Sequence, residues 1–307
     1  MAKVELRQLR YFVAVAEELN FGRAAERLLI AGPSLSQQIK ALERDLGVRL
    51  FDRDRRSVGL TPAGAALLPY ARAVLEQADD LRSRAARMSG SEPVRLGYVN
   101  WLPVDLASRV SAVAQLHVDP WVAPSHTQAA RVSAGSLDLA VCWVRTDDLE
   151  QRSLKARLLG ADRLYAVATV AGTGDVRVRD TAVLVADDTS PWLSWNIYAE
   201  RLARDTGAHA VHISDSGITG AAFFDHVRGS PRPIINSPKS QLAPLPPDLV
   251  KRPLIAPKVY WTWSLVWRRD ESRSAVLATV DTLTDGVGDL GIHGPGAWLP
   301  EDDPHRR

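Results

Sequence analysis

The N-terminal part of the chain alternates apolar and polar residues at helical spacing. An amphipathic helix is predicted from Leu6 to Ala16, and a shorter one follows before the Gly32-Pro33 break. In the next helix the apolar positions recur at intervals of four, three and four: Leu35, Ile39, Leu42 and Leu46. They share one buried face, and the opposite face is polar: Ser34, Gln37, Lys40 and Arg44. Small Ala24 and Ala25 let the helices cross closely, so the pattern predicts a helix-turn-helix.

A longer heptad pattern runs from about Pro62 to Met88. Its seam consists of apolar residues spaced four and three apart: Leu67, Ala71, Val74, Ala78, Leu81 and Ala85. A helix packed on its own domain is the ordinary alternative. Because the rest of this helix is polar, the pattern favours self-association, and we predict a dimerising linker helix over residues 62–89.

After the break at Ser89–Pro93 the rhythm becomes strand, helix, strand, which predicts a largely parallel sheet. The first unit contains expected strands at 94–99, 117–122 and 138–144 and expected helices at 103–114 and 125–134. A second unit is expected from about Arg163, with strands at 182–185, 209–213 and 258–267 and helices at 192–204, 218–227 and 272–284. Residues 90–293 therefore read as two α/β subdomains. The prolines between 231 and 247 mark irregular chain, and residues 294–307 are expected to be a disordered tail.

The N-terminal motifs resemble the DNA-binding region of LysR-type transcriptional regulators. The resemblance covers residues 1–89 and rests on five linked pieces in order: Leu9-Arg10-Tyr11-Phe12-Val13-Ala14-Val15-Ala16-Glu17, Arg23-Ala24-Ala25-Glu26-Arg27-Leu28, Pro33-Ser34-Leu35-Ser36-x-Gln38-Ile39, Leu42-Glu43-x-x-Leu46-Gly47-x-x-Leu50-Phe51-x-Arg53 and Leu60-Thr61-x-Ala63-Gly64. It implies a winged helix-turn-helix domain at 1–61 and control of transcription. A weaker resemblance of the C-terminal part implies a two-subdomain, Rossmann-like effector domain similar to periplasmic binding proteins.

The exposed start of the second motif helix and the basic hairpin after it are the expected DNA contacts, because polar side chains reach bases and cations reach phosphates. The predicted residues are Arg23, Pro33, Ser34, Ser36, Gln37, Lys40, Arg53, Arg55, Arg56 and Thr61. Two positions depart from the family pattern. Ala31-Gly32 stand where a polar cap and a Gln are usual, so Gly32 is expected as N-cap before Pro33. Gly22 replaces a usual hydroxyl residue.

A small-molecule effector is expected at the carboxyl ends of the strands, where helix N-termini offer free N–H groups. The candidate residues are Asn100, Trp101, Ser125, Thr127, Trp143, Ser216 and Thr219. Plain N-capping is an equal alternative for Ser125 and Ser216, and core packing is the alternative for the tryptophans. A small ligand with an anionic or polar end and an apolar or aromatic part would suit this set.

Composition sets the remaining bounds. The net charge is +2, but residues 1–89 carry 15 Lys/Arg against 11 Asp/Glu, which agrees with a DNA-binding N-terminus. Cys142 is the single cysteine and lies in an apolar run, where a buried hydrophobe is a better interpretation than a redox sensor. No apolar run approaches a membrane span, and no signal-peptide pattern begins the chain. A cytoplasmic setting is expected.

Three functions compete. The first is a LysR-type regulator that binds double-stranded operator DNA as a homodimer or homotetramer, senses a small metabolite and has RNA polymerase as a candidate partner. The second is an enzyme with an attached DNA-binding region; no metal spacing, phosphate loop or nucleophile elbow supports it, and no cofactor is expected. The third is an architectural DNA-binding dimer with a vestigial effector domain. A ligand-induced change in melting temperature separates the first from the third.

Overall fold

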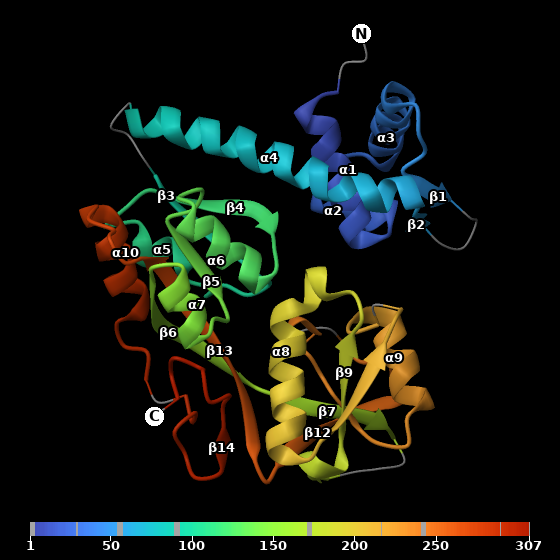
Figure 1. The fold of residues 1–307 in the computed structure, drawn as a ribbon, viewed down its shortest axis with the longest axis vertical. Coiled ribbons are helices and arrows are strands. Elements are labelled where there is room, and N and C mark those ends of the chain that lie inside the picture. Colours follow the sequence, from blue (N-terminus) through green and yellow to red (C-terminus); the bar gives the residue numbers. More distant parts are fainter. Residues whose placement is uncertain are drawn as a thin grey trace. The chain divides into compact units, whose positions relative to one another are not determined.

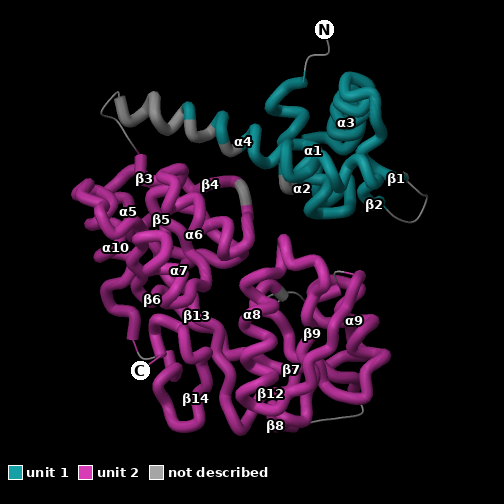
Figure 2. Tube along the Cα trace, viewed as in Figure 1, with its two compact units in different colours: residues 1–91 teal, residues 92–307 magenta. Residues whose placement is uncertain are grey.

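The computed structural model describes residues 4–28, 30–53, 58–88, 93–170, 174–215, 217–240, 244–288 and 290–306. The chain divides into two compact units, residues 1–91 and 92–307 (Figure 2). None of the helices in the described ranges is both long and apolar enough to cross a membrane.

The first unit is helical with a short antiparallel hairpin. Its elements are α1 (Leu6–Glu18), α2 (Phe21–Arg27), α3 (Gly32–Leu46), β1 (Phe51–Arg53), β2 (Val58–Leu60) and α4 (Pro62–Met88). The predicted face of α3 is confirmed, because Leu35, Ile39 and Leu42 are buried. Leu46 is exposed and lies outside this core. The cap prediction is wrong by one residue, since α3 begins at Gly32 and Ala31 is its N-cap.

The hairpin is fastened to α3 and to the helical core. The Glu43 carboxylate on α3 accepts hydrogen bonds from the backbone N–H of Leu50 at 2.9 Å and of Phe51 at 3.2 Å. The Phe51 ring packs edge-on against Phe12, with the ring centroids 5.6 Å apart. At the start of α4, a Cβ on Gly64 would lie 2.1 Å from the Leu50 carbonyl oxygen, so only glycine allows this close approach. A winged helix-turn-helix fold results.

Helix α4 has two different surfaces. Ala71 and Leu75 are buried within the unit, and Arg72 forms an ion pair with Glu17 of α1 at 3.2 Å. Val74 and Leu81 are exposed large apolar residues. The first half of the helix therefore packs on its own domain, which was the ordinary alternative for Ala71. Val74 and Leu81 are free to contact a second copy of the chain, so self-association through α4 stays a prediction. The Ala85 side chain lies outside the described residues.

The second unit contains two sheets joined by long strands. The first subdomain has the strand order β14-β13-β5-β3-β4, and β6 also pairs with β13. These strands are β3 (Val94–Tyr98), β4 (Leu116–Val122), β5 (Leu139–Cys142), β6 (Leu154–Arg163), β13 (Lys258–Arg268) and β14 (Ala297–Trp298). Strand β3 runs parallel to β4 and β5, whereas β13 runs antiparallel to β5 and β6. Its helices are α5 (Leu106–Val110), α6 (Ser125–Ser133), α7 (Thr146–Gln151) and α10 (Ser274–Thr284).

The second subdomain has the strand order β10-β9-β11-β7-β12-β8. Its strands are β7 (Tyr165–Thr169), β8 (Val176–Arg177), β9 (Ala182–Ala186), β10 (His209–Ile213), β11 (Ile234–Ile235) and β12 (Leu249–Ile255). Helix α8 (Thr189–Thr206) packs on β9 and α9 (Gly220–Gly229) packs on β7 (Figure 1). Short 3-10 turns lie at η1 (Val178–Asp180) and η2 (Pro238–Ser240). The chain crosses between the subdomains twice, from β6 to β7 and from β12 to β13. The predicted α/β class with two Rossmann-like subdomains is confirmed.

Several local predictions need correction. The sequence pattern did not reveal β6, and β12 lies just after the proline-rich stretch that was expected to be irregular. Helix α5 is shorter than the expected helix over 103–114. The expectation of a disordered tail from 294 is wrong, because Leu299 and Asp303 are buried and β14 pairs with β13. Long-range contacts, which a local pattern does not contain, hold this segment in place.

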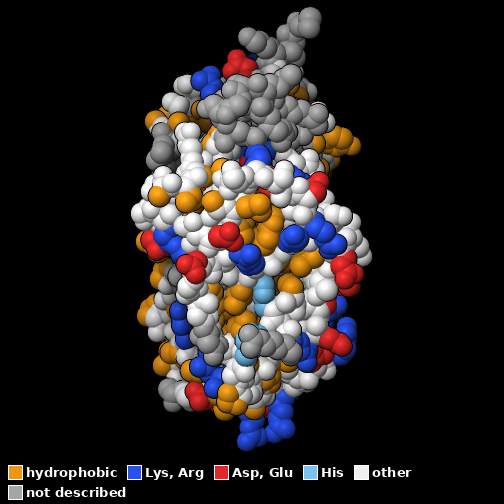
Figure 3. All heavy atoms as spheres, turned by 90° about the vertical axis from the view of Figure 1, so that its left-hand side faces the viewer, with side chains coloured by type: hydrophobic (Ala, Val, Ile, Leu, Met, Phe, Trp, Pro, Cys, Tyr) orange, Lys and Arg blue, Asp and Glu red, His pale blue; other side chains and the backbone are white. Residues whose placement is uncertain are grey.

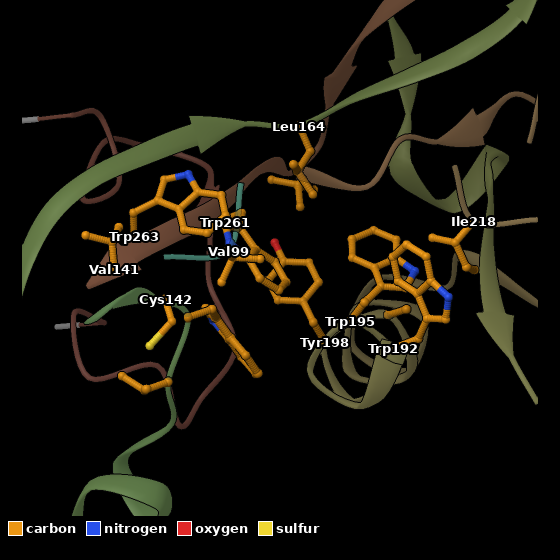
Figure 4. Close-up of a cluster of buried hydrophobic side chains, with 14 of the residues drawn as sticks. Val99, Val141, Cys142, Leu164, Trp192, Trp195, Tyr198, Ile218, Trp261 and Trp263 are labelled. Atoms are coloured by element: carbon orange, nitrogen blue, oxygen red, sulfur yellow. The ribbon is translucent and has the colours of Figure 1, made fainter. Parts of the chain in front are cut away.

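Aromatic rings fill the region between the two subdomains (Figure 4). Trp195 and Tyr198 on α8 meet Trp261 on β13, with centroid distances of 6.1 Å and 4.9 Å. The Trp143 ring lies 5.1 Å from Trp261, and Trp263 stacks on Trp101 at 6.1 Å. Of these rings, those of Trp195, Trp261 and Trp263 also line a cleft between the subdomains.

Candidate DNA-binding face and ligand cleft

The first turns of α3 present an exposed polar face. Pro33, Ser34, Gln37 and Lys40 are exposed and Ser36 is half-buried, whereas Leu35 and Ile39 point into the core. No side chain caps the start of α3, so its first backbone N–H groups can donate hydrogen bonds to a phosphate. Amide and hydroxyl groups beside a cation are the groups that read base edges and neutralise phosphates in the major groove.

Two predicted DNA contacts have partners inside the protein. The Arg23 guanidinium donates to the Glu18 carbonyl at 2.5 Å, and its side chain also pairs with the Glu18 carboxylate at 3.5 Å. The buried Thr61 hydroxyl donates to the Arg49 carbonyl at 2.6 Å and accepts from the Gly64 N–H at 2.9 Å. Thr61 is therefore an N-terminal cap of α4, and a DNA contact through this hydroxyl would compete with that role. The side chain of Arg53 and all of Arg55 and Arg56 lie outside the described residues.

A narrow apolar cleft lies between the two subdomains of the second unit. Its walls come from the end of β3, the start of α6, the start of α8, the η2 turn and β13. The lining residues are Val99, Pro124, Ser125, Pro191, Trp192, Ser194, Trp195, Ser237, Pro238, Lys239, Trp261 and Trp263. The space open to the centre of a water molecule is about 20 Å³, little more than one buried water needs. A larger ligand therefore requires the walls to move apart.

The few polar groups of this cleft suit an anion. Ser125 begins α6, where the first backbone N–H groups have no acceptor within the helix. The Ser237 hydroxyl is buried, at 1% exposure, and has no hydrogen-bond partner within the described parts of the chain. The Lys239 ammonium lies 4.3 Å from the centroid of the Trp192 ring, a cation–π contact at the cleft wall. These groups supply donors and positive charge in an otherwise apolar space.

Asn100 and His126 lie beside the cleft. The Asn100 amide donates to the Pro238 carbonyl at 3.1 Å, so it links the end of β3 to η2. Burial lowers the pKa of His126 from its usual value, and the charges of Lys239 and Arg152 lower it further. A neutral His126 at neutral pH follows from this direction.

The structure separates the predicted effector residues. Ser125 lines the cleft and accepts a hydrogen bond from the Trp143 N–H at 3.2 Å. Trp101 packs over Gly160, and Thr127 and Thr219 do not line this cleft. Trp143 does not line this cleft either, because its indole is buried and donates to Asp303 at 3.2 Å. Ser216 lies outside the described residues.

Sequence reasoning missed Ser194, Ser237 and Lys239 as cleft residues, and assigned Trp192 and Trp195 to core packing. A polar Ser237-Pro238-Lys239 run in a proline-rich stretch was the available signal. Within the described ranges, no three His, Cys, Asp or Glu side chains are placed to share a metal ion. Burial raises the pKa of the Cys142 thiol well above its usual value, which opposes a reactive thiolate.

Comparison with known proteins identifies the N-terminal domain. Residues 6–65 match the family model described as bacterial regulatory helix-turn-helix protein, lysR family. The uncharacterized HTH-type transcriptional regulator YnfL of Escherichia coli (strain K12) is 53% identical over 102 residues, which are 33% of this chain and 34% of that protein. Residues 6–65 therefore form a helix-turn-helix domain of the lysR family, and the recognition made from the sequence motifs is confirmed.

Longer matches reach into the second unit. The HTH-type transcriptional regulator BenM of Acinetobacter baylyi (strain ATCC 33305 / BD413 / ADP1) is 35% identical over 167 residues, covering 52% of this chain and 54% of that protein. The chain thus spans from about a third to about half of the length of these two relatives. A crystal structure of CbnR, a LysR family transcriptional regulator, aligns with a TM-score of 0.47 at 21% identity, over 91% of this chain and 98% of that one.

Proposed function

We propose that this protein is a sequence-specific DNA-binding regulator of transcription whose second unit senses a small anionic molecule. The observation that carries the DNA-binding part is the exposed face of α3, with Ser34, Gln37 and Lys40 opposite a buried core. In a helix-turn-helix, such a face enters the major groove. Double-stranded operator DNA is the proposed partner, and an enzymatic role is not part of the proposal.

The test is selection of bound fragments from genomic DNA, followed by gel shifts at fixed salt with wild type and Gln37→Ala. We expect Gln37→Ala to weaken specific binding by about 1–3 kcal/mol, as for one lost base contact, and Ser34→Ala to weaken it less. The matched control is Gln77→Ala, which alters an exposed glutamine on α4. Equal affinity of Gln37→Ala and Gln77→Ala for the selected site would remove α3 from base readout.

The proposed sensing site is the cleft at the start of α6. Support comes from the free helix N-terminus at Ser125, the unpartnered Ser237 hydroxyl and the Lys239 ammonium, all against indole walls. A small carboxylate with an apolar or aromatic body matches these groups. A thermal-shift screen of small carboxylates should yield binders whose affinity falls about tenfold or more in Ser237→Ala and Lys239→Met, the size expected for hydrogen bonds to a charged group.

Lys155→Met is the control for Lys239→Met, since Lys155 is an exposed lysine on β6. A ligand that binds all variants equally would place sensing elsewhere. The architectural alternative is favoured by one observation, the nearly filled cleft of about 20 Å³. A screen without any stabilising compound, together with intact DNA binding, would support that alternative.

Self-association is proposed through α4. Val74 and Leu81 are exposed apolar side chains on a helix whose other face packs in its own unit. A second copy of the chain would cover them, giving a homodimer from which a homotetramer can assemble through further contacts. Two DNA-binding domains held together in this way would read a pair of half-sites. RNA polymerase remains a candidate partner, and a cytoplasmic setting remains the expectation.

A further inference from the structure

The C-terminal segment 297–305 touches both subdomains of the second unit. Its short strand β14 pairs in parallel with Lys258 and Val259 at the start of β13, where the chain crosses between the subdomains. We propose that this segment is a clamp that fixes the subdomains against each other, and that Asp303 positions the walls of the ligand cleft. The clamp itself is inferred from contacts within the second unit. Only its role in ligand sensing rests on the proposed function.

The first anchor of the clamp is the Asp303 carboxylate, which is 2% exposed. One of its oxygens accepts hydrogen bonds from the Trp143 indole N–H at 3.2 Å and from the Thr262 hydroxyl at 2.7 Å. The other oxygen accepts from the His305 N–H at 3.0 Å. A buried carboxylate is costly unless it is hydrogen-bonded, so removing it leaves the Trp143 and Thr262 donors without this acceptor.

The second anchor joins α7 to α8 through the neighbouring residue. The Asp302 carbonyl accepts from the Thr146 N–H at 2.8 Å and from its hydroxyl at 3.1 Å. The Asp302 carboxylate forms ion pairs with Arg145 at 3.7 Å, before α7, and with Arg201 on α8. Arg145 belongs to the first subdomain and Arg201 to the second, so one acidic side chain bridges the two.

An aromatic contact extends the hold on α8. The Trp298 ring meets the Tyr198 ring edge-on at a centroid distance of 5.4 Å, and its indole N–H donates to Asp205 at 3.2 Å. Tyr198 and Asp205 lie on α8, which also carries Trp192 and Trp195 of the cleft wall. The segment therefore holds α8 at three positions along the helix.

Trp143 connects Asp303 to the cleft wall formed by Ser125 and Trp261. Its backbone N–H donates to the hydroxyl of Ser125, and its ring lies 5.1 Å from Trp261. Ser125 and Trp261 both line the cleft. The Trp143 ring also meets the Tyr198 ring of α8 edge-on, with the centroids 5.9 Å apart. Loss of the Asp303 contact should therefore loosen α8 as well as the start of α6. A segment that only stabilised the second unit as a whole would not affect the start of α6 and α8 more than the other elements.

The experiment is hydrogen exchange of the full chain without ligand, followed by mass spectrometry of peptides. In Asp303→Ala we expect exchange about tenfold faster over residues 124–130 and 192–198, the size expected for a lost hydrogen bond to a charged group. Residues 6–46 of the first unit should exchange as in wild type. The matched control is Glu301→Ala, which removes an exposed acid from the same segment and should change neither region.

Thr262→Val provides a second variant that removes one donor to Asp303 with little change of shape, and is used if Asp303→Ala does not fold. It should accelerate the same two regions to a smaller extent. Acceleration spread evenly over the whole second unit, or exchange indistinguishable from Glu301→Ala, would overturn the clamp. A carboxylate screen that yields no ligand would count against sensing, while the exchange pattern would still decide the clamp.

Discussion

The side-chain amide of Asn100 donates a hydrogen bond of 3.1 Å to the carbonyl oxygen of Pro238, although 138 positions separate the two residues. Asn100 follows β3 in the first subdomain, and Pro238 begins η2 in the segment that leads into the second subdomain's β12. The bond therefore crosses beside the cleft. Asn100 was expected to bind an effector directly, and the structure gives its amide this internal partner instead.

We predict that Asn100→Asp destabilises the chain more than Asn100→Ala does. The aspartate would place an oxygen, in place of the N–H donor, against the Pro238 carbonyl oxygen. Alanine removes the donor too, but it also removes the Asn100 Oδ1 atom, which is buried without a partner in the described structure. The alanine change should cost under about 1 kcal/mol, because losing one bond is offset by losing an unsatisfied acceptor. Urea unfolding of wild type and both variants checks this prediction, and an Asn100→Asp midpoint equal to that of Asn100→Ala would contradict it.

Glu43 should stabilise the hairpin that follows α3. Glu43→Ala leaves the buried N–H groups of Leu50 and Phe51 without their carboxylate acceptor, at an expected cost of about 1–3 kcal/mol. Thermal unfolding of the first unit followed by circular dichroism measures the effect. Arg44→Ala, an exposed change on the next residue of the helix, is the control and should be neutral within about 0.5 kcal/mol. A neutral Glu43→Ala would contradict the anchoring role.

Substitutions on the two surfaces of α4 should separate folding from association. Leu81 is 70% exposed, whereas Leu75 is buried in the unit. Leu81→Asp should leave the monomer folded and break the dimer, because a carboxylate in an apolar interface loses its solvation. Leu75→Asp should unfold the first unit instead. Sedimentation and circular dichroism distinguish the two, and a normal dimer for Leu81→Asp would exclude this interface.

Stability should fall as the pH decreases from about 6.5 to about 4, through His305. Burial, with a further contribution from His293, lowers the pKa of His305 to about 4, against about 6.5 in an unfolded chain. Between these values the unfolded chain binds more protons, so the folded state is fully stable above about pH 6.5 and loses stability as the pH falls through this window. Protonation would also disturb the 2.8 Å hydrogen bond between His305 and Ser264.

The measurement is the urea midpoint of wild type and His305→Gln at about pH 7 and about pH 5. The substitution should flatten the pH dependence, and His209→Gln, which alters an exposed histidine on β10, should not. Asp303 contributes with the opposite sign, because burial raises the pKa of its carboxyl group. It is present in all three proteins, so the difference between them isolates His305.

Charge gave only coarse information. The excess of basic residues before residue 90 pointed to the end of the chain for which DNA binding is proposed, but it did not identify a contact. On the face drawn in Figure 3, positive and negative side chains are interspersed among the described residues. Such a surface agrees with a net charge of +2. It marks no single contact, so the proposed DNA specificity is assigned to individual side chains such as Gln37.

Local sequence determined the helix-turn-helix, because burial in α3 follows from a spacing that the chain itself contains. Leu35, Ile39 and Leu42 lie within two turns of one another, and Pro33 marks a local backbone requirement at the start of α3. The alternation of strands and helices likewise determined the α/β class. These features depend on neighbours a few residues apart, which a single sequence displays directly.

Only the tertiary structure decided the cleft and the clamp. Ser125, Trp192 and Ser237 line one space although each belongs to a different element, and no periodicity relates them. Asp303 is ordered by Trp143, 160 positions away, and by Thr262, 41 positions away. Hydrogen bonding and burial at such separations depend on how the sheets pack. A polar, proline-containing stretch therefore looked disordered in sequence, but the fold holds it in place through the buried side chains of Leu299 and Asp303.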